Sequence, residues 1–212
     1  MARSIIAIVG ASASGKTLFT QTVYQELQKE LGTGDLAVLE EDAYYSDQSH
    51  LPVKMREQTN YDHPDAFEHE LLLAHLLKLR AGEDVRVPLY DFEVHNRSDK
   101  TRTVAAAEVI IVEGILLLTN PQLAQQFDIK VFVDAPLDIC LLRRIERDMR
   151  ERGRSFDSVA LQYETTVRPM YFEFIEPCKH VADIVVTGGG KNRVAIELIK
   201  QNIRSTITSR GD

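Results

Sequence analysis

The chain has 212 residues, 44% of them hydrophobic and 27% charged, which is typical of a folded protein with a sizeable core. Its formal net charge of −7 provides no general attraction to nucleic acid. The apolar runs are too short for a membrane span or a secretory signal. We therefore expect a single domain over residues 1–212, with neither a nucleic-acid nor a membrane partner. Cys140 and Cys178 fit no metal spacing and no disulfide framework, so we expect reduced thiols and a cytoplasmic location.

Short β-branched segments alternate with longer amphipathic ones along the chain. The β-branched segments are apolar almost throughout, which is typical of parallel strands buried on both faces. Strands that alternate with helices predict right-handed crossovers and a three-layer α/β fold with a parallel core sheet of about five strands. In such a sheet, ligands bind at the carboxyl ends of the strands. The expected strands are 4–10, 36–40, 108–114, 129–135 and 183–188, and the expected helices are 15–31, 64–81, 136–152, 157–176 and 191–208.

Residues 83–106 interrupt this alternation. Apolar and polar residues alternate on both sides of the polar segment "HNRSDK", residues 95–100. This pattern predicts an inserted β-ribbon, a hairpin of two antiparallel strands joined by a polar turn.

The segment "GASASGKT" matches the phosphate-binding pattern G-x-x-x-x-G-K-[ST] and lies between a predicted strand and a predicted helix. In this motif the backbone amides and the helix N-terminus surround phosphate oxygens, and the lysine reaches the β- and γ-phosphates. The hydroxyl of Thr17 is then a ligand for Mg²⁺. The predicted nucleotide-binding residues are Gly10, Ala11, Ser12, Ala13, Ser14, Gly15, Lys16 and Thr17.

Acidic residues follow two of the predicted strands. Glu113 ends an apolar run, where a carboxylate is costly to bury unless it faces a cation or water, so we expect it beside Mg²⁺. The alternative is that Glu113 caps the next turn through Gly114. The strand 36–40 ends in Glu40, Glu41 and Asp42, any of which could accept a proton from an acceptor hydroxyl. Position alone does not choose among these three acids.

The segment "RRIERDMRERGR" is rich in arginine, and we expect a lid over about 143–156 whose guanidinium groups bind phosphate oxygens. The alternative is a solvated helix with ion pairs such as Glu146–Arg150 and Arg147–Glu151. Both readings can hold, because six arginines on three turns cannot all face one way. They are Arg143, Arg144, Arg147, Arg150, Arg152 and Arg154.

The segment "NYDHPDAF" combines a helix start with a second feature. Pro64 at the first helical position, followed by Asp65 and Glu68, is ordinary helix-start chemistry. Tyr61 and Asp62 are not needed for that start. No guanine-reading N-K-x-D segment is present, so a kinase of small molecules is favoured over a GTPase switch.

Taken in order, these segments resemble the uridine kinase (uridine–cytidine kinase) family over about residues 5–205. The resemblance is carried by "GASASGKT", "EEDAYY", "NYDHPDAF", "VPLYDFEVHNR", "VEGILLL", "RRIERDMRERGR" and "QYETTVRPM". It implies a P-loop kinase fold. The implied activity is transfer of the γ-phosphoryl of ATP (or GTP), with Mg²⁺, to the 5′-hydroxyl of uridine or cytidine. The resemblance also implies a homo-oligomer, a homotetramer.

The resemblance assigns roles to individual residues. It implies that Asp42 is the general base and that Asp62, beside Tyr61, binds the ribose hydroxyls. Tyr90, Phe92 and His95 then line the base pocket, although Tyr90 could instead pack on the core and His95 could face solvent. Gln162, Arg144 and Arg154 lie on the nucleoside side, while Lys16, Arg147 and Arg152 face the phosphates and Glu113, with Thr17, is associated with magnesium.

The chemistry of the acceptor agrees with these implied roles. A carboxylate that accepts from two vicinal hydroxyls discriminates against 2′-deoxy sugars. The alternatives are a kinase of another small alcohol, similar to phosphoribulokinase or pantothenate kinase, and a non-catalytic nucleotide-binding regulatory module.

Overall fold

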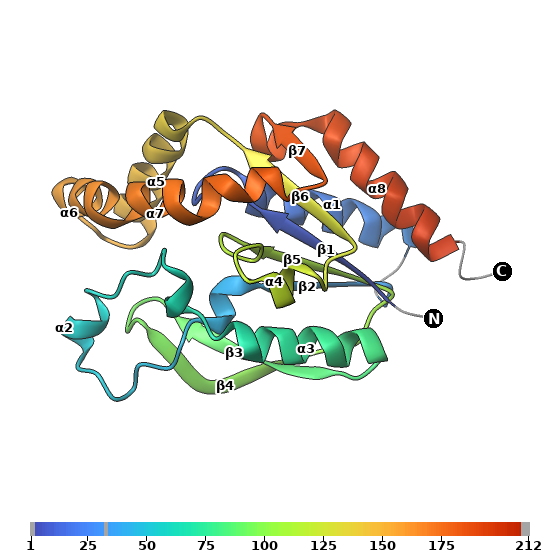
Figure 1. The fold of residues 1–212 in the computed structure, drawn as a ribbon, viewed down its shortest axis with the longest axis horizontal. Helices are drawn as coiled ribbons and strands as arrows, with labels where there is room; N and C mark the ends of the chain where they lie inside the picture. The colour runs from blue at the N-terminus through green and yellow to red at the C-terminus, as the bar shows by residue number, and fades with distance from the viewer. Residues whose placement is uncertain (1–2, 32–33, 209–212) are drawn as a thin grey trace.

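The computed structural model describes residues 3–31 and 34–208 (Figure 1). Its centre is a five-stranded sheet with the strand order β2-β5-β1-β6-β7. All its strand pairings are parallel, which confirms the predicted α/β fold. The strands are β1 Ser4–Val9, β2 Leu36–Glu40, β5 Val109–Gly114, β6 Ile129–Asp134 and β7 Ile184–Thr187.

Helices cover both faces of this sheet, as the uninterrupted apolar strands predicted. In β1 the side chains of Ile5 and Ala7 pack into one buried cluster, and those of Ile6 and Ile8 pack into a second cluster on the other face. The second cluster is completed by α1 Lys16–Leu31 and α8 Arg193–Thr208, and the first by α3 His69–Ala81 and α5 Leu137–Glu151 (Figure 1). Two short helices, α2 Val53–Arg56 and α4 Pro121–Ala124, lie in connections. In the described part of the chain, no helix combines the length and the apolarity that a membrane span requires.

The predicted helix 64–81 is wrong at its start. Pro64–Ala66 forms a separate 3-10 turn, Phe67 is extended, and α3 begins only at His69. Tertiary contacts divide the helix, because Phe67 forms a bridge with Tyr45 and the amide of Glu68 donates to the carbonyl of Tyr44. The imidazole Nδ1 of His63 caps the short turn by accepting from the amide of Asp65. Pro64 therefore starts the turn that follows Asp62, not the long helix.

The predicted helix 157–176 is helical but irregular. It consists of α6 Phe156–Gln162, a π segment Tyr163–Val167, α7 Arg168–Met170, a second π segment Tyr171–Ile175 and a 3-10 turn Glu176–His180. Pro169 lies inside this stretch and has no amide hydrogen to donate, which favours such local changes of helical pitch.

The inserted β-ribbon is present, but its turn lies earlier than predicted. The strands β3 Val85–Asp91 and β4 Asn96–Val104 pair antiparallel, so the turn is at residues 92–95 and not at 95–100. Asp91 fixes this turn because its Oδ1 accepts from the amide of Glu93 at 2.8 Å. His95 closes it with a left-handed φ of 50°.

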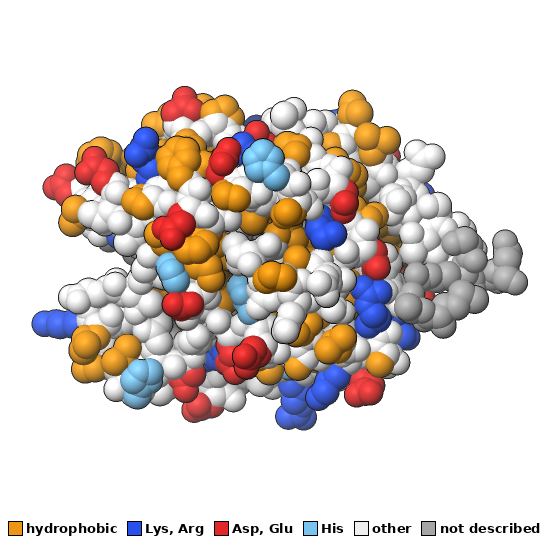
Figure 2. Space-filling view, in the orientation of Figure 1, with side chains coloured by type: hydrophobic (Ala, Val, Ile, Leu, Met, Phe, Trp, Pro, Cys, Tyr) orange, Lys and Arg blue, Asp and Glu red, His pale blue; other side chains and the backbone are white. Residues whose placement is uncertain are grey.

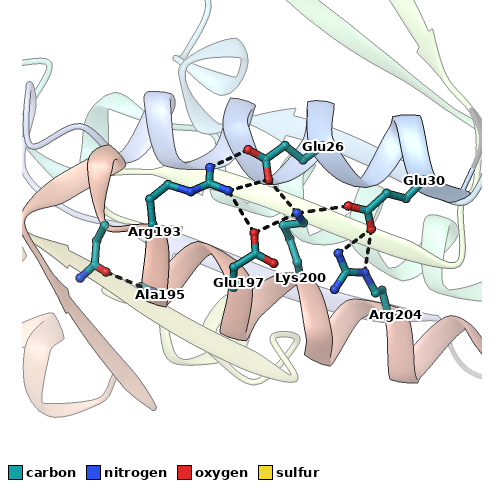
Figure 3. Close-up of polar contacts among 8 residues, drawn as sticks. Glu26, Glu30, Arg193, Ala195, Glu197, Lys200 and Arg204 are labelled. Carbon is teal, nitrogen blue, oxygen red and sulfur yellow. Dashed lines mark hydrogen bonds and ion pairs between the residues drawn. The ribbon is translucent and has the colours of Figure 1, made fainter.

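An ion cluster joins α8 to α1, the helix that follows the phosphate loop (Figure 3). At its centre the buried ammonium of Lys200 contacts Glu26 at 2.6 Å, Glu30 at 3.2 Å and Glu197 at 3.1 Å. Arg193 bonds Glu26 and Glu197, and Arg204 bonds Glu30. We call these six residues the α1–α8 cluster. It fixes the C-terminal helix on the helix that carries the phosphate loop.

Candidate active site

The phosphate loop, residues 10–17, leads from β1 directly into α1, the context its motif requires. The loop curls because Ala13 and Gly15 adopt positive φ values of 64° and 98°. Gly15 tolerates this conformation because it has no Cβ atom. Lys16 and Thr17 follow as the first two residues of α1, so both side chains start at the helix N-terminus.

Glu113 lies against the start of α1. The hydroxyl of Thr17 donates to Glu113 Oε1 at 2.6 Å, and the ammonium of Lys16 is 3.8 Å from the same oxygen. Burial raises the pKa of the Glu113 carboxyl, while Lys16 and Thr17 oppose that shift. Glu113 does not cap the following turn, because the amides of Ile115 and Leu116 donate to Glu41.

This pair of oxygens fits Mg²⁺. Magnesium binds hard oxygen ligands and keeps waters and substrate phosphates, so one or two protein oxygens are enough. Within residues 3–31 and 34–208, no group of three or more His, Cys, Asp and Glu residues could hold a metal ion. The hydroxyl of Thr17 and the carboxylate of Glu113 are therefore the candidate ligands at this place.

The three acids after β2 have different environments. Glu40 is exposed, whereas Glu41 is fully buried and accepts from His69 Nε2 at 2.8 Å and from two backbone amides that follow β5. Asp42 is half-buried. Burial raises the pKa of Asp42 to about 6; Lys16 opposes this shift, and Glu41 and Glu113 add to it. Asp42 is thus the acid that is near Lys16 of the phosphate loop and that no hydrogen bond or ion pair holds within residues 3–31 and 34–208.

Asp62 is buried beside the phosphate loop. It lines a cavity together with Ala11 and Ser12 of the loop, and with Arg144 of α5. Burial raises the pKa of Asp62, and the nearby charges of Arg144, Lys16 and Arg147 oppose this shift. A buried carboxylate in this setting is a strong acceptor for hydroxyl groups that enter the cavity.

The predicted aromatic residues come together at the end of the ribbon. The ring of Tyr61 stacks with that of His95 at 5.7 Å, and the rings of Tyr90 and Phe92 are 5.0 Å apart. Sequence reasoning missed Tyr45, whose ring lies 4.9 Å from Tyr90 and 5.1 Å from Tyr61.

The two alternatives for the ribbon residues have different outcomes. Tyr90 does pack against the core cluster, yet its buried hydroxyl has no hydrogen-bond partner in the described part of the chain. His95 is half-buried and not turned to solvent, and this burial lowers its pKa. A neutral imidazole can donate or accept a hydrogen bond, depending on its tautomer.

Residues 143–156 are here called the lid segment. Its arginines separate into three groups. Arg150 pairs with Glu146 on the surface, as predicted, while the predicted Arg147–Glu151 pair is replaced by Arg147–Asp148 at 2.8 Å. Arg143 donates to the carbonyls of Ala13 and Ser14 in the phosphate loop. The remaining four surround Asp148, a fully buried acid that sequence reasoning missed; they are Arg144, Arg147, Arg152 and Arg154.

Gln162 and Arg152 connect the lid segment to the predicted nucleoside pocket. The side-chain amide oxygen Oε1 of Gln162 accepts from both Arg144 and Arg154. The guanidinium of Arg152 lies 5.1 Å from the centre of the Phe92 ring at the ribbon turn. In Figure 2 the outline is hollowed on the left, between the part that contains α5, α6 and α7 and the part that contains α2 and the ribbon.

Comparison with known proteins identifies relatives of the whole chain. Residues 5–195 match the model of the phosphoribulokinase/uridine kinase family. The chain is 54% identical to a uridine kinase of Psychromonas ingrahamii over 94% of each chain. It is 50% identical to a uridine kinase of Haemophilus ducreyi over 97% of this chain and 95% of that protein. In fold it resembles the phosphoribulokinase of Rhodobacter spheroides with a TM-score of 0.65 at 16% identity, covering 87% of this chain and 70% of that one.

Proposed function

Since this chain belongs to the phosphoribulokinase/uridine kinase family, we propose that it transfers the γ-phosphoryl group of ATP (or GTP) to the 5′-hydroxyl of uridine or cytidine. The products are UMP or CMP, and the reaction belongs to pyrimidine salvage. One arrangement carries the proposal. Asp62 lines a cavity with Ala11 and Ser12 of the phosphate loop, and Lys16 of that loop is within electrostatic reach of Asp42. Tyr45, whose ring contacts that of Tyr90, is within electrostatic reach of both acids.

In this proposal Asp42 accepts the proton of the 5′-hydroxyl as that oxygen attacks the γ-phosphorus. Its raised pKa of about 6 suits a general base, because the carboxylate is ionised at neutral pH and more basic than an exposed one. Lys16, Arg147 and Arg152 stabilise negative charge on the phosphoryl oxygens. Mg²⁺, when held by Thr17 and Glu113, neutralises charge on the β- and γ-phosphates.

The nucleoside is held by the buried acid and the aromatic group. Asp62 accepts from the two ribose hydroxyls, which would leave it underpaired with a 2′-deoxyribose. Tyr61, Tyr90 and Phe92 hold the pyrimidine ring by their faces and edges. His95 bonds the exocyclic group of uracil or cytosine, while Arg144, Arg154 and Gln162 approach the nucleoside from the lid segment.

A coupled ADP-release assay tests the proposal. The purified protein, with ATP and then GTP as donor, is offered uridine, cytidine, 2′-deoxyuridine, ribulose 5-phosphate and pantothenate. We expect turnover of uridine and cytidine, and a value of kcat/KM for 2′-deoxyuridine lower by about 10²-fold. Turnover of another alcohol alone would indicate a different kinase, and binding of ATP without turnover would indicate a regulatory module.

The role of Asp62 is tested separately with a matched pair of variants. Asp62→Asn should lower kcat/KM for uridine by about 10- to 100-fold and reduce the preference for ribose over deoxyribose. Asp65→Asn, three residues away with a side chain that is 91% exposed, should keep both values. Wild-type discrimination in Asp62→Asn would exclude the proposed role of Asp62.

Two further parts of the proposal concern location and assembly. Both cysteines are free thiols in buried positions, which supports a reducing, cytoplasmic compartment. The family resemblance supports a homotetramer, and light scattering on the eluted protein should give the mass of four chains.

A further inference from the structure

Asp148 holds no position in the proposed reaction, yet four of the lid arginines surround it. We propose that Asp148 is a positioning residue: a shared counterion that keeps four guanidinium groups gathered before the substrates bind, Arg147 and Arg152 for the donor phosphates and Arg144 and Arg154 for the nucleoside. The inference rests on the proposed function, because it deepens the role given there to the lid segment.

The geometry places Asp148 at the centre of this group. Arg147 binds Oδ1 closely, with Nε at 2.9 Å and Nη2 at 2.8 Å. The other three guanidinium groups lie slightly farther from the carboxylate: Arg144 at 3.6 Å, Arg152 at 3.7 Å and Arg154 at 3.6 Å. The Asp148 side chain is fully buried, so water does not compete for it.

The backbone after α5 brings Arg154 back to the acid. After α5 ends, Gly153 adopts a left-handed φ of 62°, which reverses the direction of the chain. The amide of Arg154 then donates to the main-chain carbonyl of Asp148 at 3.1 Å. Asp148 therefore holds Arg154 through both its backbone and its carboxylate.

The charges of Asp148 and the four arginines around it do not balance. One carboxylate faces four guanidinium groups, which repel one another at this distance in a partly desolvated site. Three of the four contacts are longer than a hydrogen bond, and Asp148 Oδ2 has no hydrogen-bond partner in the described part of the chain. One carboxylate thus holds the four arginines near one another. Arg144 and Arg154 also donate to Gln162, whereas Arg147 and Arg152 are the two that face the phosphates in the proposed reaction, and phosphate oxygens form paired hydrogen bonds with such forks.

The experiment compares wild-type enzyme, Asp148→Asn and the control Glu146→Gln. Glu146 lies on the same helix, and its exposed side chain pairs with the exposed Arg150. The measurements are kcat and KM for ATP with uridine, the dissociation constant for inorganic tripolyphosphate, and thermal unfolding. Tripolyphosphate probes the phosphate site without an acceptor, so its binding tests the inference even if uridine proves not to be the substrate.

In Asp148→Asn we expect kcat to fall by about tenfold or more, because the arginines lose their common anchor. Tripolyphosphate should bind at least as tightly as to wild type, because the site has gained net positive charge. Glu146→Gln should match wild type in both kcat and tripolyphosphate affinity. A kcat within about threefold of wild type would overturn the inference. So would a joint loss of kcat and tripolyphosphate affinity, which is the sign of a disordered lid.

Asp148→Glu keeps the inference testable if the Asn variant does not fold. Because it retains the negative charge, its kcat should lie above that of Asp148→Asn, or remain measurable where the Asn variant is inactive. A Glu variant that folds, binds tripolyphosphate as wild type and lacks all phosphotransfer would count against a counterion role.

Discussion

Charge is arranged in opposite ways in two regions of the molecule, the α1–α8 cluster on one face of the central sheet and the carboxyl ends of the strands beside the phosphate loop. In the α1–α8 cluster, three acids face three basic side chains, and the bonds from Arg193 and then Lys200 hold the pKa of Glu26 at about 2. At the strand ends, burial raises the pKa of Asp42, Asp62 and Glu113. The first arrangement satisfies its charges within the protein, whereas the second leaves acids and arginines underpaired.

This difference separates stabilising charges from charges that act on a ligand. A paired surface cluster contributes modestly to stability and requires nothing from outside. Desolvated acids and crowded arginines cost folding free energy, which is expected where the missing partners are substrate groups. Changes at the strand ends should therefore alter activity, and changes in the α1–α8 cluster should alter stability.

The largest effect is expected from Asp42→Asn. The variant removes the proposed base, so kcat should fall by about 10³-fold, while the affinity for ATP remains nearly unchanged. Its thermal midpoint should not fall, because a half-buried carboxylate with a raised pKa is replaced by a neutral amide. Stopped-flow or coupled kinetics measure kcat, and a thermal melt measures the thermal midpoint. Near-wild-type turnover would remove Asp42 from the mechanism and weaken the contrast between the strand ends and the α1–α8 cluster.

The pH dependence of activity, set at the strand ends, should also differ from the pH dependence of stability, to which the α1–α8 cluster contributes. The pKa of Asp42 is raised to about 6, so the carboxyl is protonated below that pH and kcat/KM should decline by about tenfold per pH unit there. Glu26 behaves oppositely: its pKa is lowered from 4.5 to about 2, so its stabilising contribution is complete above pH 4.5 and is lost as the pH falls toward 2. Activity should therefore fall between pH 6 and 5 while the thermal midpoint shows no loss from Glu26. An acid limb of kcat/KM near pH 4 would contradict the proposed environment of Asp42.

The smallest effect is expected from Lys200→Met. The substitution leaves Glu26, Glu30 and Glu197 without their shared ammonium, so the thermal midpoint should fall by about 2–4 °C. Lys29→Met, at an exposed position on α1, should change it little. In both variants kcat should stay within about twofold of wild type. A strong loss of kcat in Lys200→Met would show that the α1–α8 cluster affects the phosphate loop after all.

The sequence predicted most elements of the site because they depend on local patterns. The phosphate loop is contiguous, and the strands are apolar throughout, so both can be read from short windows. Only the family resemblance singled out Asp42. The position of the acids did not separate Glu41 from Asp42, because the physical distinction depends on His69 and on the amides after β5, which are distant in the chain. Asp148 could have been found from its spacing, four residues after Arg144 and four before Arg152.

By itself, then, the sequence determined the α/β alternation, the phosphate loop and the inserted ribbon. Only the tertiary structure decided where the helix after Asp62 begins, where the ribbon turns and which acid is left unengaged. Each of these depends on a contact between distant segments, such as the bridge from Phe67 to Tyr45 or the bonds to Glu41. Such contacts override local propensity, because buried polar groups must find partners wherever the fold places them.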